Sequence, residues 1–392
     1  MNVAFLTDSF PPIIDGVSRC VVEYAKAFTN GEHGKCIVVT PNKPGRNDQD
    51  YSFPVFRFTS VPLPKMEYRL GYPYLPEIKK IFKEYKIDII HAHSPFMAMT
   101  LARQLRRGLN IPVIYTQHTK WEFDIAHAVG IPLVAKSIEK FIYSNINAAN
   151  DVWAVSQKAG EHMKSRGFKG DFIVMQNGTD FPRADADENL IKDIKQKYGL
   201  NEDEPVLLFV GRMMWYKNQA IIIDALEILK SQNFKFKMIF IGDGIDMEDM
   251  KATVREKKLD EKVFFIGRVA DRELLRAYYT CADMFVFPST YDTAGIVIGE
   301  AAACRCPSLV VRGSAASETL NEFGEDQTGF FAEENPASVA ACIKESLENK
   351  AHYALVKKNA SDKVYLPWSE VVVNSIARYN EVLEVYKSKI KK

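Results

Sequence analysis

Long apolar runs are absent from this sequence, and no uninterrupted stretch approaches the roughly 18 residues that a membrane-spanning helix needs. The first residues, Met1–Asp8, carry no basic segment ahead of a long apolar one, which argues against a secretory signal peptide and favours a first strand. We therefore expect a cytoplasmic protein, with attachment to the inner face of the cell membrane as an open alternative.

Cysteine and net charge are both scarce. Six cysteines are spread over 392 residues without a CxxC pair, so neither a zinc motif nor a disulfide framework is visible, which fits a reducing compartment. The net charge of +1 is too balanced for a dedicated nucleic-acid binder, and we expect no nucleic-acid partner. Residues 1–180 nevertheless hold 22 basic and 17 acidic residues. This excess favours an anionic ligand or an anionic membrane surface, unless it only reflects solvated helix faces.

The sequence does contain a regular alternation of apolar runs and amphipathic helical stretches, which predicts parallel sheets with crossover helices. In the first half we expect strands at Val3–Leu6, Cys36–Thr40, Ile87–His91, Val113–Thr116 and Val152–Val155. In the second half we expect them at Val206–Val210, Met238–Ile241, Val263–Ile266, Met284–Phe287 and Ser308–Val311. The length suggests two domains. We predict an α/β fold of two Rossmann-like domains, residues 1–182 and 190–368, with parallel sheets facing across a cleft.

The segment Ser289–Ala303 leaves a strand, turns through a polar loop and enters an apolar helix. Ligands of open α/β sheets bind beyond the carboxyl ends of the strands, and a helix N-terminus there offers unpaired N–H groups to a phosphate. Asp292 precedes this terminus, and Glu300 lies about 7–8 Å beyond Gly295 at 1.5 Å per helical residue. Two carboxylates that flank an anion site suit a nucleotide sugar. The alternative is a capping Asp and a solvent-facing Glu.

Two other loops follow strand ends. Arg212 and Lys217 come after Val206–Val210 and would together neutralise a departing diphosphate, unless they belong to a solvated face. Gly16 opens a helix after the first loop, where a glycine allows close approach of the backbone to a phosphate or sugar. The GxGxxG spacing is missing, so NAD binding is not supported, and a turn glycine without a ligand remains the alternative.

Histidines also cluster after two strands, His91 and His93 after one and His118 after the next. The HxH spacing suggests a metal, but no third ligand of suitable spacing is evident, so we favour structural or polar roles for His91 and His93. Asp185-Ala186-Asp187 matches the DxD pattern with which some sugar transferases bind a metal. It lies in a polar linker, and we expect no metal site there.

Together these segments resemble glycosyltransferase family 4, whose members are retaining enzymes with the GT-B fold. The resemblance covers nearly the whole chain because six motifs appear in the family's order. They are the Pro11-Pro12…Gly16 loop, Gly211-Arg212…Lys217, Ile241–Gly244, Phe265–Arg268, Ala282–Ser289 and Asp292…Glu300.

The resemblance implies a role for each matching residue. Glu300 would contact the nucleotide ribose, and Asp292 and His118 the donor sugar. Arg212 and Lys217 would bind the diphosphate. The remaining donor-binding positions would be Gly16, Arg268, Gly295, Ile296 and Val297. Such enzymes need neither a divalent metal nor another cofactor, and their C-terminal helix, here about residues 370–392, crosses back to the first domain.

The sequence departs from the family pattern at two positions. Asp292 stands where the family has Glu, and Arg305 stands where a small residue or glycine is usual. His93-Ser94-Pro95-Phe96 and Gln117-His118-Thr119 resemble a bacterial branch near the diacylglycerol glucosyltransferases, which act at the membrane surface. Lys79, Lys80 and Lys83, on a helix with Ile78 and Phe82, would suit such a surface, unless the apolar residues simply pack on the sheet.

We therefore predict a glycosyltransferase that moves a hexose, with retention, from a nucleotide sugar to a hydroxyl of a diacylglycerol-type lipid or a cell-envelope glycan. UDP-glucose is the expected donor. A catalytically degenerate binding or chaperone subunit is one alternative, supported by Asp292 and Arg305. A nucleotide-sugar epimerase is the other. Release of free nucleotide would separate the transferase from both.

Overall fold

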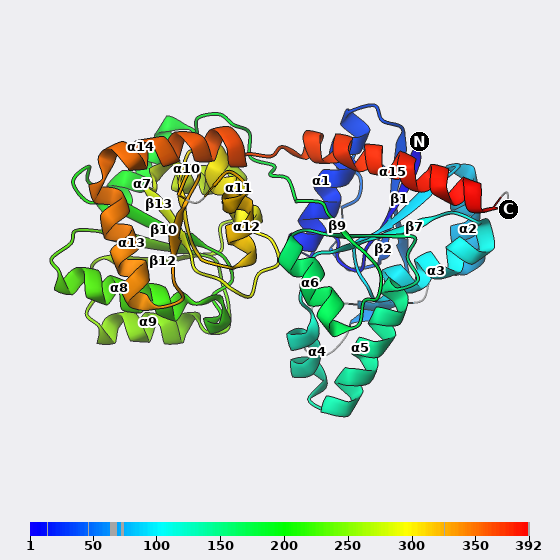
Figure 1. Cartoon of the computed structure of the whole chain (residues 1–392), viewed down its shortest axis with the longest axis horizontal. Helices are drawn as coiled ribbons and strands as arrows, with labels where there is room; N and C mark the ends of the chain where they lie inside the picture. The colour runs from blue at the N-terminus through cyan, green and yellow to red at the C-terminus, as the bar shows by residue number, and fades with distance from the viewer. Residues whose placement is uncertain (14, 46, 63–68, 72–73, 325, 391–392) are drawn as a thin grey trace. The chain divides into compact units, whose positions relative to one another are not determined.

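A computed structural model describes residues 1–392 apart from 14, 46, 63–68, 72–73, 325 and 391–392. Its contacts divide the chain into two units, each drawn in Figure 1. Unit 1 is Met1–Gly178 with Trp368–Lys392, and unit 2 is Thr179–Pro367. The division falls at residue 178, before the residue 182 that we expected, because the two segments that pass between the units pair with each other. Thr179 donates its backbone N–H to the Leu366 carbonyl at 2.8 Å.

The sheet of unit 1 has seven strands in the order β3-β2-β1-β6-β7-β8-β9, and all neighbouring pairs are parallel. Val3 of β1 lies opposite Cys36 of β2 on one side and Ile89 of β6 on the other. The central strands are buried on both faces, as parallel strands covered by helices must be. The strands are β1 (Asn2–Leu6), β2 (Lys35–Pro41), β3 (Val55–Phe58), β6 (Ile89–Ala92), β7 (Val113–Gln117), β8 (Asp151–Ala154) and β9 (Ile173–Val174).

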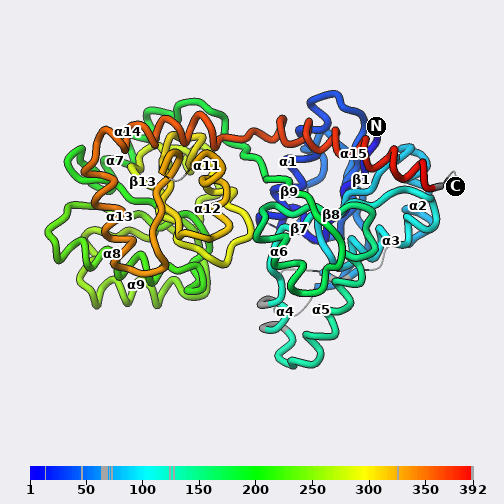
Figure 2. Tube along the Cα trace, in the orientation of Figure 1, coloured from blue at the N-terminus to red at the C-terminus, as the bar shows by residue number. Residues whose placement is uncertain are grey.

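The helices of unit 1 follow amphipathic stretches of sequence. Asp15 caps the first helix by accepting a hydrogen bond from the Ser18 N–H at 2.7 Å. The last helix lies beside the first, as the red and blue traces of Figure 2 show. The ring centroids of Trp368 and Tyr24 are 5.0 Å apart. The helices are α1 (Gly16–Asn30), α2 (Leu75–Glu84), α3 (Met97–Leu109), α4 (Glu122–Val129), α5 (Pro132–Ile146), α6 (Gln157–Arg166) and α15 (Trp368–Ile390), and a small antiparallel pair is formed by β4 (Ser60–Pro62) and β5 (Arg69–Gly71).

Unit 2 repeats this architecture around a six-stranded parallel sheet in the order β12-β11-β10-β13-β14-β15. Its strands are β10 (Val206–Val210), β11 (Lys237–Ile241), β12 (Val263–Gly267), β13 (Met284–Phe287), β14 (Ser308–Val311) and β15 (Phe330–Ala332). Its helices are α7 (Glu188–Tyr198), η1 (Trp215–Lys217), α8 (Gln219–Ser231), α9 (Met247–Glu256), α10 (Arg272–Cys281), α11 (Ile296–Ala303), α12 (Ala315–Asn321), α13 (Pro336–Glu348), α14 (Lys350–Asn359) and η2 (Ala360–Val364). Both units are thus Rossmann-like, as predicted.

Helix α2 does not offer the apolar face that we considered for membrane contact. Ile78 and Phe82 are buried in the core of unit 1, while Lys80 and Lys83 are exposed. The apolar residues of this helix therefore pack on the sheet. Among the described residues, no helix is both long enough and apolar enough to span a lipid bilayer.

Candidate active site

The loop after β10 is held by close backbone contact with the loop after β11. Met213 donates its N–H to the Asp243 carbonyl at 3.0 Å, and Gly211 donates to Ile241 at 3.0 Å. Gly242 has a φ of 137°, and a Cβ atom there would overlap the Gly211 carbonyl oxygen. Glycine is therefore required where these two loops meet, and the sequence Gly211-Arg212 is fixed in place by Gly242.

Lys217 and Asp292, predicted to be neighbours in the donor site, are bonded to each other. Lys217 lies in η1, Asp292 lies in the loop between β13 and α11, and the Lys217 Nζ donates to Asp292 Oδ1 at 2.7 Å. Both side chains are largely buried, and Asp292 Oδ2 has no partner among the described residues. Arg212, from the same loop as Lys217, is exposed. One cationic group, Lys217, thus stands beside a carboxylate whose second oxygen has no partner among the described residues.

Glu334 accepts hydrogen bonds from both loops that carry this pair. The Asn218 side chain donates to the Pro288 carbonyl at 3.0 Å and to Glu334 Oε1 at 2.7 Å. Thr290 Oγ1 lies 3.0 Å from the same Glu334 oxygen. These bonds connect the ends of β10, β13 and β15, which explains why residues distant in sequence keep one geometry.

Glu300 is buried, which excludes the solvent-facing alternative. Arg272 Nη2 donates to its Oε1 at 2.8 Å, and the Tyr279 hydroxyl donates to its Oε2 at 3.1 Å. Arg272 also donates through Nε to Asp180 at 3.0 Å. Burial alone would lower the pKa of Arg272, but Glu300 and Asp180 outweigh it and raise that pKa. Arg272, Tyr279 and Asp180 were not among the residues predicted from the sequence.

Helix α11 begins directly after the Asp292 loop. Its N-cap is Gly295, so Asp292 does not cap the helix, and that alternative is wrong as well. The first-turn N–H groups of a helix have no partner within it, and here they belong to Ile296 and Val297. Arg268 follows β12, is exposed and forms no hydrogen bond with any described residue. The structure therefore does not bring Arg268 into the Lys217–Asp292 pair.

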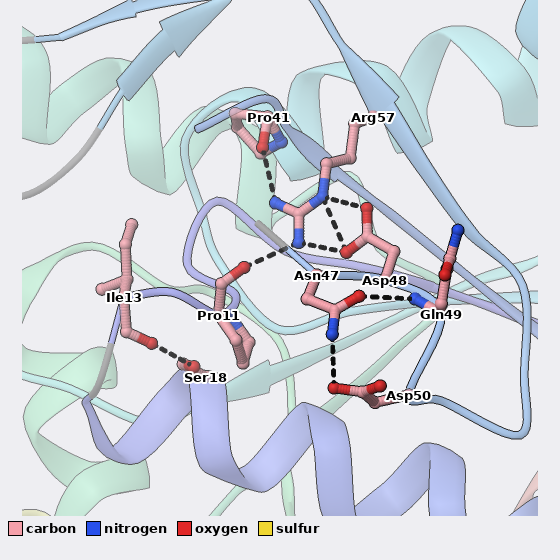
Figure 3. A network of polar contacts seen from close by, with 9 residues as sticks. All are labelled: Pro11, Ile13, Ser18, Pro41, Asn47, Asp48, Gln49, Asp50 and Arg57. Atoms are coloured by element: carbon pink, nitrogen blue, oxygen red, sulfur yellow. Dashed lines mark hydrogen bonds and ion pairs between the residues drawn. The ribbon is translucent and has the colours of Figure 1, made fainter. Parts of the chain in front are cut away.

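The first loop of unit 1, which leads to Gly16, is anchored by a residue that sequence reasoning missed. Arg57 of β3 donates to the Pro11 carbonyl at 2.6 Å and to Asp48 through Nε at 2.8 Å, as Figure 3 shows. The Ser18 hydroxyl donates to the Ile13 carbonyl at 2.7 Å and holds the same loop from α1. Gly16 itself is exposed as the first residue of α1, as a position open to a ligand must be.

The three histidines of the sequence pattern gather at the ends of β6 and β7. His91 is bonded on both sides, to the Tyr379 hydroxyl and the Thr116 hydroxyl, each at 2.6 Å. His93 Nδ1 lies 2.9 Å from His118 Nε2, and the two rings stack with centroids 5.2 Å apart. The structural role preferred for His91 fits these contacts, and His93 sits against the predicted sugar-binding histidine.

Burial keeps these imidazoles neutral. It lowers the pKa of His118 to about 3 and the pKa of His91 and His93 well below the ordinary value, and the neighbouring histidines add to the shift at His91 and His93. A neutral imidazole carries one donor and one acceptor nitrogen, which suits hydroxyl groups. Residues of the loops after β6 and β7 line a small pocket beside His93 and His118, with Trp121 among them.

A fourth buried titratable group follows β1, the strand that pairs with β6. Asp8, at the end of β1, accepts a hydrogen bond from the Ala98 N–H at 3.0 Å, in the first turn of α3. Burial raises the pKa of Asp8 to about 7, although bonds from the backbone of α3 lower it. Its Oδ2 has no partner among the described residues.

The possible metal ligands also take clear positions. Asp187 caps α7 by accepting from the Asn189 N–H at 2.8 Å, and Asp185 is exposed and paired with Arg305. These contacts account for both carboxylates of the DxD pattern. The histidine set does acquire a third potential ligand, which spacing along the chain did not reveal. Cys20 of α1 places its Sγ 3.9 Å from His118 Nε2.

Comparison with known proteins shows the same two-part organisation. The sequence model of Glycosyltransferase Family 4 matches residues 14–183, and that of Glycosyl transferases group 1 matches residues 191–363. The alpha-monoglucosyldiacylglycerol synthase of Streptococcus pneumoniae is 26% identical over 315 residues, which cover 79% of this chain and 70% of the relative. The synthase of the same name from Acholeplasma laidlawii is 26% identical over 359 residues, covering 88% and 87%.

A solved structure confirms the predicted fold. The crystal structure of Anabaena Alr3699/HepE in complex with UDP and glucose matches with a TM-score of 0.76 and 21% identity, covering 97% of this chain and 100% of that one. The two synthases named above are sugar-transferring enzymes, so the comparisons favour neither a binding subunit nor an epimerase. The chain belongs to glycosyltransferase family 4 and is a glycosyltransferase with the GT-B fold.

Proposed function

We propose that this glycosyltransferase moves glucose from UDP-glucose to a hydroxyl of a diacylglycerol-type lipid, with retention at the anomeric carbon. The observation that carries the proposal is the bonded Lys217–Asp292 pair at the start of α11. A cation and a carboxylate at one helix N-terminus match the needs of a sugar diphosphate, whose phosphates require positive charge and whose hexose hydroxyls require an acceptor.

In the proposed reaction, the cations act on the leaving group. As the sugar departs, negative charge grows on the diphosphate, and Lys217 and Arg212 stabilise it together with the backbone N–H groups of Ile296 and Val297. Lys217 is already oriented by Asp292, so little reorganisation accompanies the charge transfer. Glu300, held by Arg272 and Tyr279, accepts from the ribose hydroxyls.

The hexose is recognised by neutral or acceptor groups. Asp292 Oδ2, which has no partner among the described residues, accepts from a sugar hydroxyl. His118 stays neutral and orients the sugar through hydrogen bonds rather than through charge. Because Lys217 and Arg212 supply the positive charge, transfer needs no divalent metal. Activity is expected to survive EDTA unchanged.

The acceptor assignment rests on the relatives and on one surface. The names of the two synthases include diacylglycerol, which supports a lipid acceptor. Helix α5 carries large apolar side chains in the open, with Leu133 75%, Ile131 57% and Phe141 49% exposed, where Ile131 is the N-cap. Lys136 and Lys140 flank them, and the nearby Glu139 is paired with Arg166 at 2.7 Å.

Apolar side chains flanked by lysines suit the surface of an anionic bilayer. We propose that α5 holds the enzyme on the inner face of the cell membrane, where a lipid acceptor would lie. Replacing Leu133 and Phe141 by serine should reduce co-sedimentation with phosphatidylglycerol vesicles at least tenfold. The matched control is Val373→Ser on α15, a valine of 53% exposure. Equal loss in both variants, or no loss in either, would remove α5 from the proposal.

The function is tested by calorimetry with a panel of nucleotide sugars, followed by measurement of nucleotide release. Tight binding and slow hydrolysis of UDP-glucose are expected, and release of UDP should accelerate when diacylglycerol is supplied in vesicles, because the lipid hydroxyl then takes the glucose in place of water. Proton NMR of the product should show the same anomeric configuration as the donor. Acceleration by a soluble glycan instead of the lipid would replace the acceptor. Binding of bare UDP without turnover of any sugar would refute the proposal.

A further inference from the structure

Three side chains from three segments of unit 1 converge on one point. Cys20 lies on α1, His93 follows β6 and His118 follows β7, and each is mostly or fully buried. The His93 Nδ1 and His118 Nε2 atoms are 2.9 Å apart, the Cys20 Sγ is 3.9 Å from His118 Nε2, and the three atoms lie within 4.8 Å of one another. Among the described residues, this is the one such grouping of three histidine, cysteine or acidic side chains.

We propose that Cys20, His93 and His118 form a Zn²⁺ site whose occupation inhibits glycosyl transfer. One thiolate and two neutral imidazoles are ligands that zinc prefers, whereas Mg²⁺ and Ca²⁺ prefer oxygen. The metal is an inhibitor here and not a cofactor, because it would engage the histidine that the proposed function assigns to the donor sugar. Its inhibitory effect therefore rests on that function, but its binding does not.

Two of the three distances between the ligand atoms are close to those of a tetrahedral site. With Zn–N near 2.0 Å and Zn–S near 2.3 Å, tetrahedral ligands stand about 3.3 Å apart for two nitrogens and about 3.6 Å apart for nitrogen and sulfur. The observed 2.9 Å and 3.9 Å differ from these values by a few tenths of an ångström. The fourth position is left to water or to the Asn177 Oδ1, which already accepts from the Cys20 thiol at 3.3 Å.

Proton balance is simple at this site. Cys20 loses its thiol proton to solvent, and one proton is released for each Zn²⁺ bound. His93 and His118 share a single proton in their mutual hydrogen bond, and that proton moves to the far nitrogen of one of the two rings. The far nitrogen of His93, Nε2, has no partner among the described residues and can accept it. Both imidazoles then remain neutral, as metal ligands must be.

Burial raises the pKa of the Cys20 thiol well above its ordinary value, and Glu23 adds to the shift. Zinc therefore has to displace a tightly held proton.

Binding is measured on the full chain in thiol-free buffer without substrate. Co²⁺ is the spectroscopic probe, since its bond to a thiolate gives a charge-transfer absorption, and calorimetry with Zn²⁺ gives the stoichiometry. One Zn²⁺ per chain is expected for the wild type and for the control Cys342→Ser, whose thiol lies in unit 2. Cys20→Ser retains a donor to Asn177, so the fold should survive, but the absorption should vanish and Zn²⁺ affinity should fall at least 100-fold.

His93→Gln provides an independent variant, with an expected loss of at least 30-fold in Zn²⁺ affinity. Equal affinity or an unchanged Co²⁺ spectrum in Cys20→Ser would overturn the site. In nucleotide release, free Zn²⁺ should inhibit the wild type and Cys342→Ser, while Cys20→Ser should keep full activity and need at least tenfold more Zn²⁺. Metal binding without inhibition would refute the regulatory role. A chain that binds Zn²⁺ as expected but never releases nucleotide would instead contradict the proposed function.

Discussion

The two units place their candidate residues at the same point of the fold, but the residues are charged in unit 2 and neutral in unit 1. In both, the candidate residues follow the carboxyl ends of parallel strands. In unit 2 they are charged and mutually paired, as with Lys217–Asp292 and Arg272–Glu300. In unit 1 they are neutral and aromatic, with His91, His93 and His118 in ring contact in the interior.

This difference shows how each unit stabilises its buried polar groups. Paired ions keep their charge when buried, because each neutralises the desolvation cost of the other, and they remain available to a charged ligand. Imidazoles that form hydrogen bonds but no ion pair with a carboxylate lower their desolvation cost by staying neutral, which leaves them suited to hydroxyls. Loss of a charged group should therefore act on turnover in unit 2, whereas pH should act on stability in unit 1.

The largest effect is expected from Lys217→Met. Removal of a cation that stabilises the leaving diphosphate should lower the rate of nucleotide release about 100- to 1,000-fold, the range for preorganised charge-stabilising groups. The unfolding free energy should change by about 1 kcal/mol, since Asp292 keeps some solvent contact. Steady-state kinetics and urea denaturation measure the two effects separately.

Lys257→Met is the matched control for Lys217, because Lys257 also pairs with acids, Asp224 and Glu227, but on the surface of unit 2. Its turnover should equal that of the wild type. If Lys217→Met kept its activity, the charged pairs of unit 2 would have no demonstrated role in turnover. If both variants lost activity, the effect would be structural.

The next effect in size is expected from Gly242→Ala. An alanine Cβ would overlap the Gly211 carbonyl oxygen at a φ of 137°, so the loop carrying Arg212 must move, at a cost of about 2 kcal/mol or more. UDP affinity, measured by calorimetry, should fall at least tenfold. Gly299→Ala in α11 is the control, because its Cβ would meet Thr179 at an ordinary 3.5 Å. Wild-type affinity in Gly242→Ala would show that the loop contact does not shape the site.

Acidification should destabilise unit 1. Below about pH 6.5 the unfolded chain binds a proton at each of the three histidines, while the native chain keeps His118 neutral down to about pH 3 and holds His91 and His93 neutral as well. Asp8 opposes them, because its raised pKa of about 7 lets the native chain hold a proton that the unfolded chain releases above about pH 3.9.

The unfolded chain thus binds up to three protons at the histidines that the native chain lacks, while the native chain binds one at Asp8 that the unfolded chain lacks. This net difference gives the unfolding free energy an upper slope of about 2–3 kcal/mol per pH unit between about pH 6 and pH 4, and stability falls as pH falls. Urea denaturation at several pH values, followed by the fluorescence of a tryptophan of unit 1, measures this slope. Asp8→Asn removes the opposing contribution and should steepen the slope by about 1 kcal/mol per unit. A flat profile would mean that the histidines are already charged in the native state, which would end the contrast between the units.

The sequence was most informative where structure depends on local pattern. Every strand expected from an apolar run is present, with ends that match or differ by at most two residues, because burial of a parallel sheet requires such runs. In the two main sheets, strands β3, β9 and β15 were missed, since β3 includes the polar Arg57 and the other two are only two and three residues long. Their places are set by neighbouring strands rather than by their own composition.

The residues of the site also divide into those that the sequence pattern predicts and those that it does not. Residues at strand ends, such as Lys217 and Asp292, were foreseeable because topology brings those ends together. Arg272 and Asp180 were not, since they reach Glu300 through contacts between segments far apart in sequence. Cys20 was missed for the same reason, because its approach to His118 brings α1 and the loop after β7 together in the fold and has no counterpart in residue spacing.

The smallest effect is expected at Arg305, where the sequence departs from its family. Arg305 follows α11 with a φ of 57°, a left-handed conformation that costs a side-chain-bearing residue about 1 kcal/mol relative to glycine. Its ion pair with Asp185 is exposed and contributes little. Arg305→Gly should therefore stabilise unit 2 by about 0.5–1 kcal/mol in urea denaturation, with nucleotide release unchanged. Arg305→Lys keeps both the charge and the Cβ atom and should leave stability as it is. A gain of stability in Arg305→Lys, or a loss of stability in Arg305→Gly, would show that the contacts of the guanidinium outweigh the backbone strain at this position. The ion pair with Asp185 would then stabilise unit 2 although it is exposed.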